Sequence, residues 1–319
     1  MCPCQSVCAV VTRALFILVA LVGVLRVTWV KNDRNYWFLT FLFLPLFIEM
    51  IITLKRRKGK DYKWFSPPIF LFLISIIPSI WILELHHQEN KTKDPECNNL
   101  DSLENILKVL TPNDTSINNT SQVEDYMKKI NHVLSSVCSN EWILALHQIL
   151  LILLIVGKWL LPLGGGVTRD KLSQLLLIFV GTAADILEFT NETLSDVKDN
   201  SPELVYIILS VWTWTMLQFP LHLSVVTDSE GDLSAKEQGL LRRNSTDIWN
   251  ILEALFIQDG PFLVVRLTVM ILFETIHQML VFFAIKNALV VILNLYRLVV
   301  ICQDYRSSRQ NPVGSEDDP

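Results

Sequence analysis

Long apolar runs recur along this chain of 319 residues. Most of them are close to the roughly 20 residues that an α-helix needs to cross about 30 Å of hydrocarbon. Inside a bilayer the backbone must satisfy its own hydrogen bonds, so such runs fold as helices. The mean hydropathy of +0.37, with 51% apolar and 18% charged residues, is too high for a soluble chain of this size. The sequence therefore predicts an all-α, polytopic membrane protein whose main partner is the lipid bilayer, and it does not favour nucleic acid as a partner.

Eight segments are candidates for membrane-spanning helices. They are residues 9–30, 36–54, 66–85, 142–161, 172–189, 204–226, 248–274 and 279–301. A cleaved signal peptide is the alternative for the first segment. However, Arg26 follows its apolar centre directly, and no small-residue cleavage pattern precedes a polar start. We therefore expect about eight transmembrane helices.

The seventh segment contains a helix breaker, Asp259-Gly260-Pro261. We expect one broken span there, and the alternatives are an interfacial helix followed by a span or a re-entrant hairpin. A proline kink is the commoner explanation of such a break. Transporters, however, use broken helices near the midplane to hold ions and substrates. The break is therefore also a candidate functional element.

Basic residues orient the expected helices. Lys and Arg concentrate in the short connection 55–65, which the positive-inside rule places in the cytoplasm. The next polar segment then lies outside, and both termini lie in the cytoplasm of a protein that we expect in the plasma membrane. The chain accordingly divides into three helices with the basic loop (1–86), an outer loop (87–141), five helices (142–303) and a cytoplasmic tail (304–319).

The expected outer side carries signals of the secretory pathway. Four asparagines on that side head sequons at which we expect N-glycosylation: Asn113, Asn118, Asn119 and Asn191. Cys97 and Cys138 face an oxidising compartment in this topology, so we expect a disulfide that closes a small extracellular loop. A cytosolic loop would keep the same cysteines as free thiols, and their pairing is therefore a test of the orientation.

Two further signals fall on the expected cytoplasmic side. Ser245 lies in Arg242-Arg243-Asn244-Ser245-Thr246, which fits both a basic-directed kinase site and a sequon. We expect this loop inside, where only phosphorylation of Ser245 can occur. The cysteines beside the first span, Cys2, Cys4 and Cys8, suit palmitoylation better than zinc binding.

Ionisable residues inside the expected spans form the candidate polar site. The candidates are Glu84, His147, Asp185, Glu188, Arg266 and Glu274. Each such residue costs roughly 2.5 to 3.5 kcal/mol near the centre of a span and usually faces protein or water. Asp185 and Glu188 share one helical face because they are three residues apart, and Lys286 is a further cation at a similar depth. Ion pairs between helices are the commoner explanation. An outward-facing vestibule for a cation or a small polar ligand, and snorkelling to the interface, are the alternatives.

The sequence contains no pattern of known catalytic chemistry. It has no Ser-His-Asp arrangement, nucleophile elbow, zincin or kinase motif. Glu84, His86 and His87 could ligate a metal, but further ligands at suitable spacing are missing. We therefore expect no enzyme, no cofactor and no metal site.

Several motifs carry a resemblance to a known family. They are Tyr62-Lys63-Trp64-Phe65-Ser66-Pro67, Leu83-Glu84-Leu85-His86-His87, Gly164-Gly165-Gly166, Thr168-Arg169-Asp170, the run 181–190, Gln258-Asp259-Gly260-Pro261-Phe262 and Leu295-Tyr296-Arg297-Leu298. With them the chain resembles the transmembrane protein 26 family over nearly every span, while the outer loop and the tail diverge. The resemblance implies a multi-pass protein of the cell surface and supplies no catalytic residues.

These observations leave two classes of function. We expect a non-enzymatic cell-surface interaction or signalling protein with an extracellular protein as partner. The alternative is a transporter, channel or scramblase-like protein that uses the outer polar residues as a vestibule. The two differ in whether the intramembrane charges bind a ligand or one another.

Overall fold

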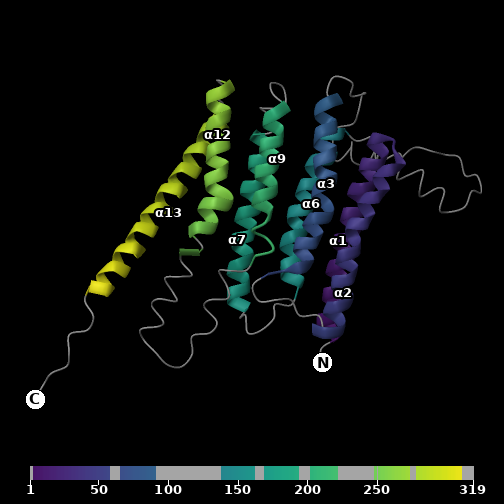
Figure 1. The fold of residues 1–319 in the computed structure, drawn as a ribbon, viewed down its shortest axis with the longest axis horizontal. Helices are drawn as coiled ribbons and strands as arrows, with labels where there is room; N and C mark the ends of the chain where they lie inside the picture. Colours follow the sequence, from purple (N-terminus) through teal and green to yellow (C-terminus); the bar gives the residue numbers. More distant parts are fainter. Residues whose placement is uncertain are drawn as a thin grey trace, which may run out of the picture.

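The computed structural model describes residues 3–57, 65–90, 138–161, 169–193, 202–221, 248–249, 251–273 and 278–310. These residues are almost entirely helical (Figure 1). Seven helical segments among them are long and apolar enough to cross a membrane. The prediction of a polytopic helical membrane protein is thereby confirmed.

The helices run side by side along one axis (Figure 1). In chain order the elements are α1 (Pro3–Lys31), the 3-10 helix η1 (Arg34–Phe43), α2 (Leu44–Arg57), α3 (Pro67–Asn90), α6 (Ser139–Leu160), α7 (Arg169–Glu188), the π-helix η3 (Phe189–Thr193), α9 (Pro202–Met216), the π-helix η4 (Ala254–Asp259), α12 (Gly260–Phe273) and α13 (Gln278–Gln310). The first residues of α1 and the last residues of α13 lie at the same end of the bundle, and α13 leans away from its neighbours at that end.

Aromatic stacking and a glycine hold α1, α3 and α6 together. Phe16 and Phe72 stack with ring centroids 4.4 Å apart. Gly157 lets α6 approach this pair, because a Cβ at position 157 would lie 2.6 Å from Cζ of Phe16. Small residues of this kind are typical where transmembrane helices pack closely. This part of the bundle is therefore held mainly by apolar contacts.

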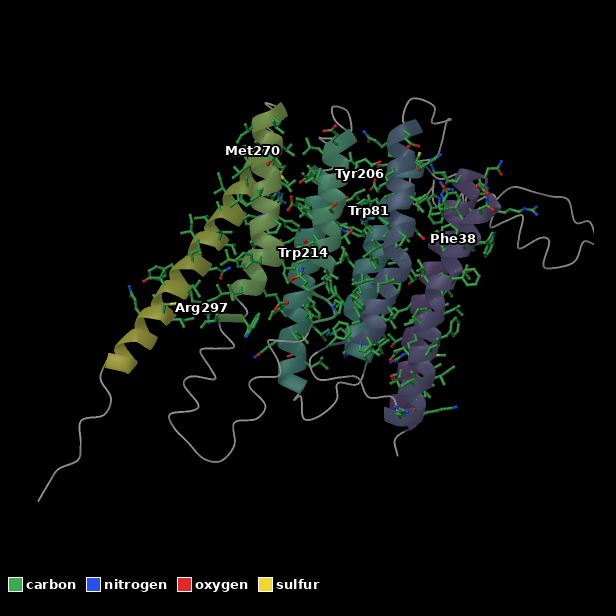
Figure 2. All side chains as sticks on the ribbon, in the orientation of Figure 1. Phe38, Trp81, Tyr206, Trp214, Met270 and Arg297 are labelled. Carbon is green, nitrogen blue, oxygen red and sulfur yellow. The ribbon has the colours of Figure 1, made fainter. Side chains whose placement is uncertain are left out.

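The outer faces of the helices carry large apolar side chains (Figure 2). Phe38 of η1 and Ile271 of α12, for example, are well exposed. Such side chains would be unfavourable in water but match the acyl chains of a bilayer. The apolar exterior and the lengths of the helices thus point to the same environment.

The sixth expected span is shorter than predicted. α9 has 15 residues and ends at Met216, where the chain turns instead of continuing as a helix to residue 226. Pro220 lacks an amide hydrogen and disfavours the helical conformation of the residue before it. The turn is anchored from two sides, since Phe219 O accepts from Lys158 Nζ at 3.1 Å and Pro220 O accepts from the amide of Ser66 at 2.7 Å. Residues 222–226 lie outside the described part of the chain.

The expected break at Asp259-Gly260-Pro261 takes the form of a wider helical turn. The chain stays helical from residue 251 to residue 273, with the π-helix η4 directly before Gly260. The amide of Gly260 bonds to Leu255 O, five residues back, which leaves Phe256 O without its helical donor. Pro261 has no amide hydrogen for Ile257 O.

Side chains of α9 satisfy both of these carbonyls. Trp214 Nε1 donates to Phe256 O at 3.0 Å. The single hydroxyl hydrogen of Thr215 is shared between Val211 O of its own helix, at 2.8 Å, and Ile257 O, at 3.1 Å. A buried carbonyl without a partner would cost about 1–3 kcal/mol. The proline therefore widens this helix without unwinding it, because a neighbouring helix replaces the lost donors.

Candidate functional site

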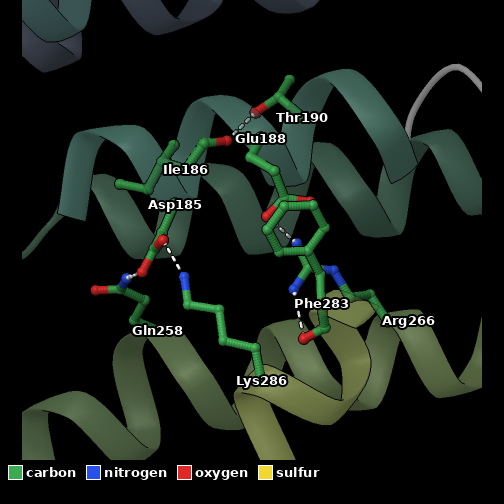
Figure 3. Close-up of polar contacts among 8 residues, drawn as sticks. All are labelled: Asp185, Ile186, Glu188, Thr190, Gln258, Arg266, Phe283 and Lys286. Carbon is green, nitrogen blue, oxygen red and sulfur yellow. Dashed lines mark hydrogen bonds and ion pairs between the residues drawn. The ribbon is translucent and has the colours of Figure 1, made fainter. Parts of the chain in front are cut away.

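Three helices bring ionisable side chains together inside the membrane (Figure 3). Asp185 and Glu188 come from one face of α7, and Arg266 and Lys286 come from α12 and α13, which pack against each other. Arg266 Nη2 donates to Glu188 Oε2 at 2.5 Å, and Lys286 forms an ion pair with Asp185. We call these residues, together with Gln258 and Asp259 of η4, the α7 charge cluster.

The cluster lies well inside the spans. Asp185 belongs to the apolar segment Leu172–Asn191, about 9 Å from its later end and about 20 Å from its start at 1.5 Å per residue. Arg266 is likewise about 9 Å from the later end of the segment Ile251–Leu272. Charges at this depth are stable only when they are paired or reached by water.

Arg266 is enclosed by protein. Its side chain is 1% exposed, and Nη1 donates to Phe283 O at 3.2 Å. The guanidinium lies 5.6, 6.0 and 5.3 Å from the ring centroids of Phe189, Phe262 and Phe283. Phe189 and Phe262 also stack on each other, with centroids 4.0 Å apart. The aromatic faces contribute attraction to the cation beyond the ion pair with Glu188.

The other half of the cluster is more open. The side chains of Asp185 and Lys286 are 30% and 34% exposed. Gln258 Nε2 donates to the second carboxylate oxygen of Asp185 at 3.3 Å. Asp259 is only 7% exposed and interacts electrostatically with Asp185, Lys286 and Arg266. Its side chain makes no hydrogen bond or ion pair with any described residue.

The cluster is incompletely satisfied. Two buried polar atoms of the cluster have no hydrogen-bond partner among the described residues: Glu188 Oε1 and Arg266 Nε. The cluster holds three carboxylates and two cations, which is a formal charge of −1. Each unsatisfied buried polar atom costs about 1–3 kcal/mol. The α7 charge cluster is therefore a costly feature of the bundle.

A second ion pair, between α1 and α2, differs from the cluster because none of its buried polar atoms lacks a hydrogen-bond partner. Arg13 donates from Nε and from Nη2 to the two carboxylate oxygens of Glu49, both at 2.7 Å. Its Nη1 donates to Ala9 O at 3.0 Å, and Thr53 Oγ1 donates to Glu49 at 2.7 Å. Bidentate pairing of this kind is the strongest form of arginine–carboxylate contact. This pair serves as a structural reference for the α7 charge cluster.

The structure gathers three of the six candidate residues. Asp185, Glu188 and Arg266 lie together, and their hydrogen bonds and ion pairs involve neither Glu84 nor His147. Glu84 is buried on α3. His147 is buried on α6, where its ring meets Trp212 edge-on at 5.0 Å.

Three members of the cluster were not among those six candidates, and one of them, Asp259, was predicted only as part of the helix breaker. The sequence indicates Lys286 only as a nearby cation, and it gives no sign of Gln258 beyond its place beside the helix breaker. Glu274 lies outside the described residues. An uncharged amide such as Gln258 is hard to find from sequence, because its role depends on which helix faces it.

The modification sites fall largely outside the described part of the chain. This applies to Cys2, Cys97, Asn113, Asn118, Asn119 and Ser245, and to the side chain of Cys4. Cys138 directly precedes α6, and Cys8 is half-buried on α1. Asn191 is exposed in η3, whereas Thr193 of the same sequon is fully buried. Of these two sequon residues, only the asparagine, which would carry the glycan, is exposed.

Comparison with known proteins gives one finding on identity. The model of the family described as transmembrane protein 26 matches residues 4–297. No solved structure gives a significant match. The match covers every described helix apart from the first residue of α1 and the later part of α13. The chain therefore belongs to the transmembrane protein 26 family.

Proposed function

We propose that this protein is a non-enzymatic cell-surface protein that acts by interaction or signalling. The observation that carries the proposal is the pairing of intramembrane charges between helices. Arg13 pairs with Glu49, Arg266 with Glu188 and Lys286 with Asp185. Charges that pair in this way hold helices together and are not free to bind a ligand. The polar loops are then the parts of the protein that would bind a partner.

The outer loop is the expected recognition element. Its sequence, residues 87–141, carries two cysteines and, well away from its ends, the three sequons of Asn113, Asn118 and Asn119. A bridge between Cys97 and Cys138 would fasten the loop directly to the start of α6, since Cys138 precedes this helix. For a loop of this length the chain-entropy model gives a stabilisation of about 4 kcal/mol. Such a fastened, glycosylated loop suits a protein partner outside the cell.

The cytoplasmic side supplies the expected regulation. Phosphorylation of Ser245 would add close to two negative charges beside Arg242 and Arg243. Palmitoylation of Cys2, Cys4 or Cys8 would place an acyl chain next to the first helix. Both modifications need the proposed orientation, in which the termini and the loop of Ser245 face the cytoplasm.

Replacement of the outer loop tests the proposal. Residues 95–137 are exchanged for a Gly/Ser linker of equal length, and partners on intact cells are captured with a membrane-impermeant crosslinker. We expect loss of the captured partners at unchanged surface expression. The matched control replaces residues 311–319, which leaves outside partners in place. Full retention of the partners without the outer loop contradicts the proposal.

One observation favours the alternative of a transporter, channel or scramblase-like protein. Asp259 is buried without an ion pair among the described residues, beside the half-exposed Asp185 and Lys286. Polar groups of this kind mark ion and substrate paths in other membrane proteins. Flux of ions or lipids in liposomes that contain the purified protein would support this alternative, provided that Asp259→Asn abolishes the flux.

A further inference from the structure

Gln148 places an amide on the lipid-facing side of α6. This helix packs against α1, α3 and α7, and the face that they leave uncovered carries Gln148 together with Ile149 and Ile152, all three of which are exposed. At 1.5 Å per residue, Gln148 lies about 14 Å from the start and about 18 Å from the end of the apolar segment Ser139–Leu160. The amide is therefore near the middle of the membrane, too far from either interface for its side chain to reach water.

The side-chain amide of Gln148 makes no hydrogen bond with any described residue. Other polar side chains on the spans do so within their own helix: Ser210 of α9 donates to Tyr206 O at 2.7 Å, and Thr268 of α12 donates to Val264 O at 2.8 Å. Short hydroxyl side chains commonly bond back in this way. An amide carries two N–H donors and a carbonyl acceptor, and acyl chains offer partners for neither. Exposure of this amide to lipid is therefore unfavourable.

A second copy of the chain fits this amide. Two copies with the same orientation in a membrane are related by an axis along the membrane normal, so equal residues lie at equal depth. Around a two-fold axis the contact is self-complementary, and the two Gln148 amides meet. Each amide donates an N–H to the carbonyl of the other, because it is both donor and acceptor. Ala145, one turn before Gln148, is small enough to let the two helices approach.

We propose that this protein forms a homodimer in the membrane through the face of α6 that carries Ala145, Gln148 and Ile152, which we call the α6 face. Two reciprocal hydrogen bonds between the Gln148 amides lie at the centre of the contact, with apolar packing around them. Hydrogen bonds between amide side chains are one of the forces that associate transmembrane helices. The inference goes beyond the proposed interaction function, because it concerns the spans and a second copy of the chain instead of the outer loop and an outside partner.

Energy transfer between labelled copies of the full-length protein in liposomes tests the proposal. Donor and acceptor fluorophores are attached at residue 319, and transfer is followed as the protein is diluted in lipid. We expect transfer above the level of random proximity. Gln148→Leu should raise the dissociation constant of the dimer about tenfold, because it removes both interhelical hydrogen bonds. Random transfer for the native chain, or an unchanged dissociation constant in Gln148→Leu, overturns the proposal.

A second glutamine provides the matched control for this measurement. Gln174 of α7 is also exposed, but it lies only two residues after the start of the segment Leu172–Asn191, about 3 Å inside the span. Water at the interface can satisfy its amide. Gln174→Leu should therefore associate like the native chain, and a weakening equal to that of Gln148→Leu would contradict a specific role of the α6 face.

Cysteine cross-linking tests the position of the contact. Ile152→Cys puts a thiol one turn after Gln148 on the same face, where the two-fold axis brings it near its equivalent. Oxidation of isolated membranes should give more covalent dimer than the native chain gives, and adding Gln148→Leu should reduce the yield. Ser210→Cys, at an exposed position of α9, is the matched control and should add no dimer. Equal yields from Ile152→Cys and Ser210→Cys contradict a contact through the α6 face.

Discussion

At the scale of single residues, the charged side chains of this bundle differ in how completely they are enclosed. Arg266 is held by Glu188, by a carbonyl and by three aromatic rings. Asp185 and Lys286 form their pair at a half-exposed position. Removing one partner of an enclosed pair leaves a buried charge uncompensated, whereas a charge left at the half-exposed pair can still be reached by water.

The two pairs should therefore respond differently to mutation. Glu188→Gln is expected to destabilise the protein by about 3 kcal/mol, because Arg266 keeps its charge in a dry environment. Asp185→Asn should lower the free energy of unfolding by clearly less than Glu188→Gln does. The measurement is thermal unfolding of both variants in nanodiscs. The combined exchange Glu188→Arg with Arg266→Glu should recover part of the stability, and failure of any recovery would show that the pair is not the main interaction of either residue.

Gly157 gives a second prediction at this scale. Gly157→Ala places a methyl group against the ring of Phe16, which is stacked on Phe72. Overpacking of this kind typically costs 1–3 kcal/mol, and it should lower the midpoint of thermal unfolding. Gly181→Ala is the matched control, because no atom lies within 4 Å of a Cβ built there. Phe16→Leu should relieve the clash in the double variant, and a loss of stability equal to that of Gly157→Ala alone would exclude it as the cause.

At the scale of elements, the positions of the helices can be predicted from the sequence. Whether a given turn is α-helical or π-helical cannot. Apolar runs of suitable length identify the spans, because each helix satisfies its own backbone hydrogen bonds. The π-helix η4 depends in addition on Trp214 and Thr215, which lie 42 residues before the carbonyls that they reach. A breaker such as Pro261 therefore predicts an irregularity, while its form is decided by the neighbouring helix.

The candidate site, too, is only partly predictable from the sequence. The spacing of Asp185 and Glu188 indicates a shared face of α7 from sequence alone. Which cation meets which acid depends on how α12 and α13 are turned toward that face, and periodicity does not give this rotation. Pairing of Asp185 with Arg266 is equally compatible with the sequence. In the structure Arg266 meets Glu188, and Lys286 meets Asp185.

The support of η4 by α9 can be tested with a double-mutant cycle. Thr215→Val removes the hydroxyl near Ile257 O, and Pro261 cannot replace it because it has no amide hydrogen. We expect a loss of about 1–2 kcal/mol of unfolding free energy. In the background Pro261→Ala the new amide can donate to Ile257 O, so the same substitution should cost less. Equal costs in both backgrounds, measured by thermal unfolding, would contradict this account of the π-helix.

At the scale of the whole molecule, α9 decides how many times the chain crosses the membrane. Its 15 residues span about 22 Å, which is less than the roughly 30 Å of a bilayer core. The turn after it can lie at membrane depth only if its backbone is buried in protein. The bonds from Lys158 and Ser66 to this turn meet that condition. α9 can thus cross together with its turn, which gives an even number of crossings.

An even number of crossings places both ends of the helical bundle on one side, as the positions of α1 and α13 also indicate (Figure 1). The proposed placement of the basic segment 55–65 in the cytoplasm predicts that epitope tags fused at residue 1 and residue 319 bind antibody only after the cells are permeabilised. A tag inserted at residue 118 should be labelled on intact cells, and the protein should shift in electrophoresis after enzymatic removal of N-glycans. Labelling of only one terminal tag on intact cells would mean an odd number of crossings. In that case α9 would not traverse the membrane, and the buried turn at Phe219 and Pro220 would mark a re-entrant segment.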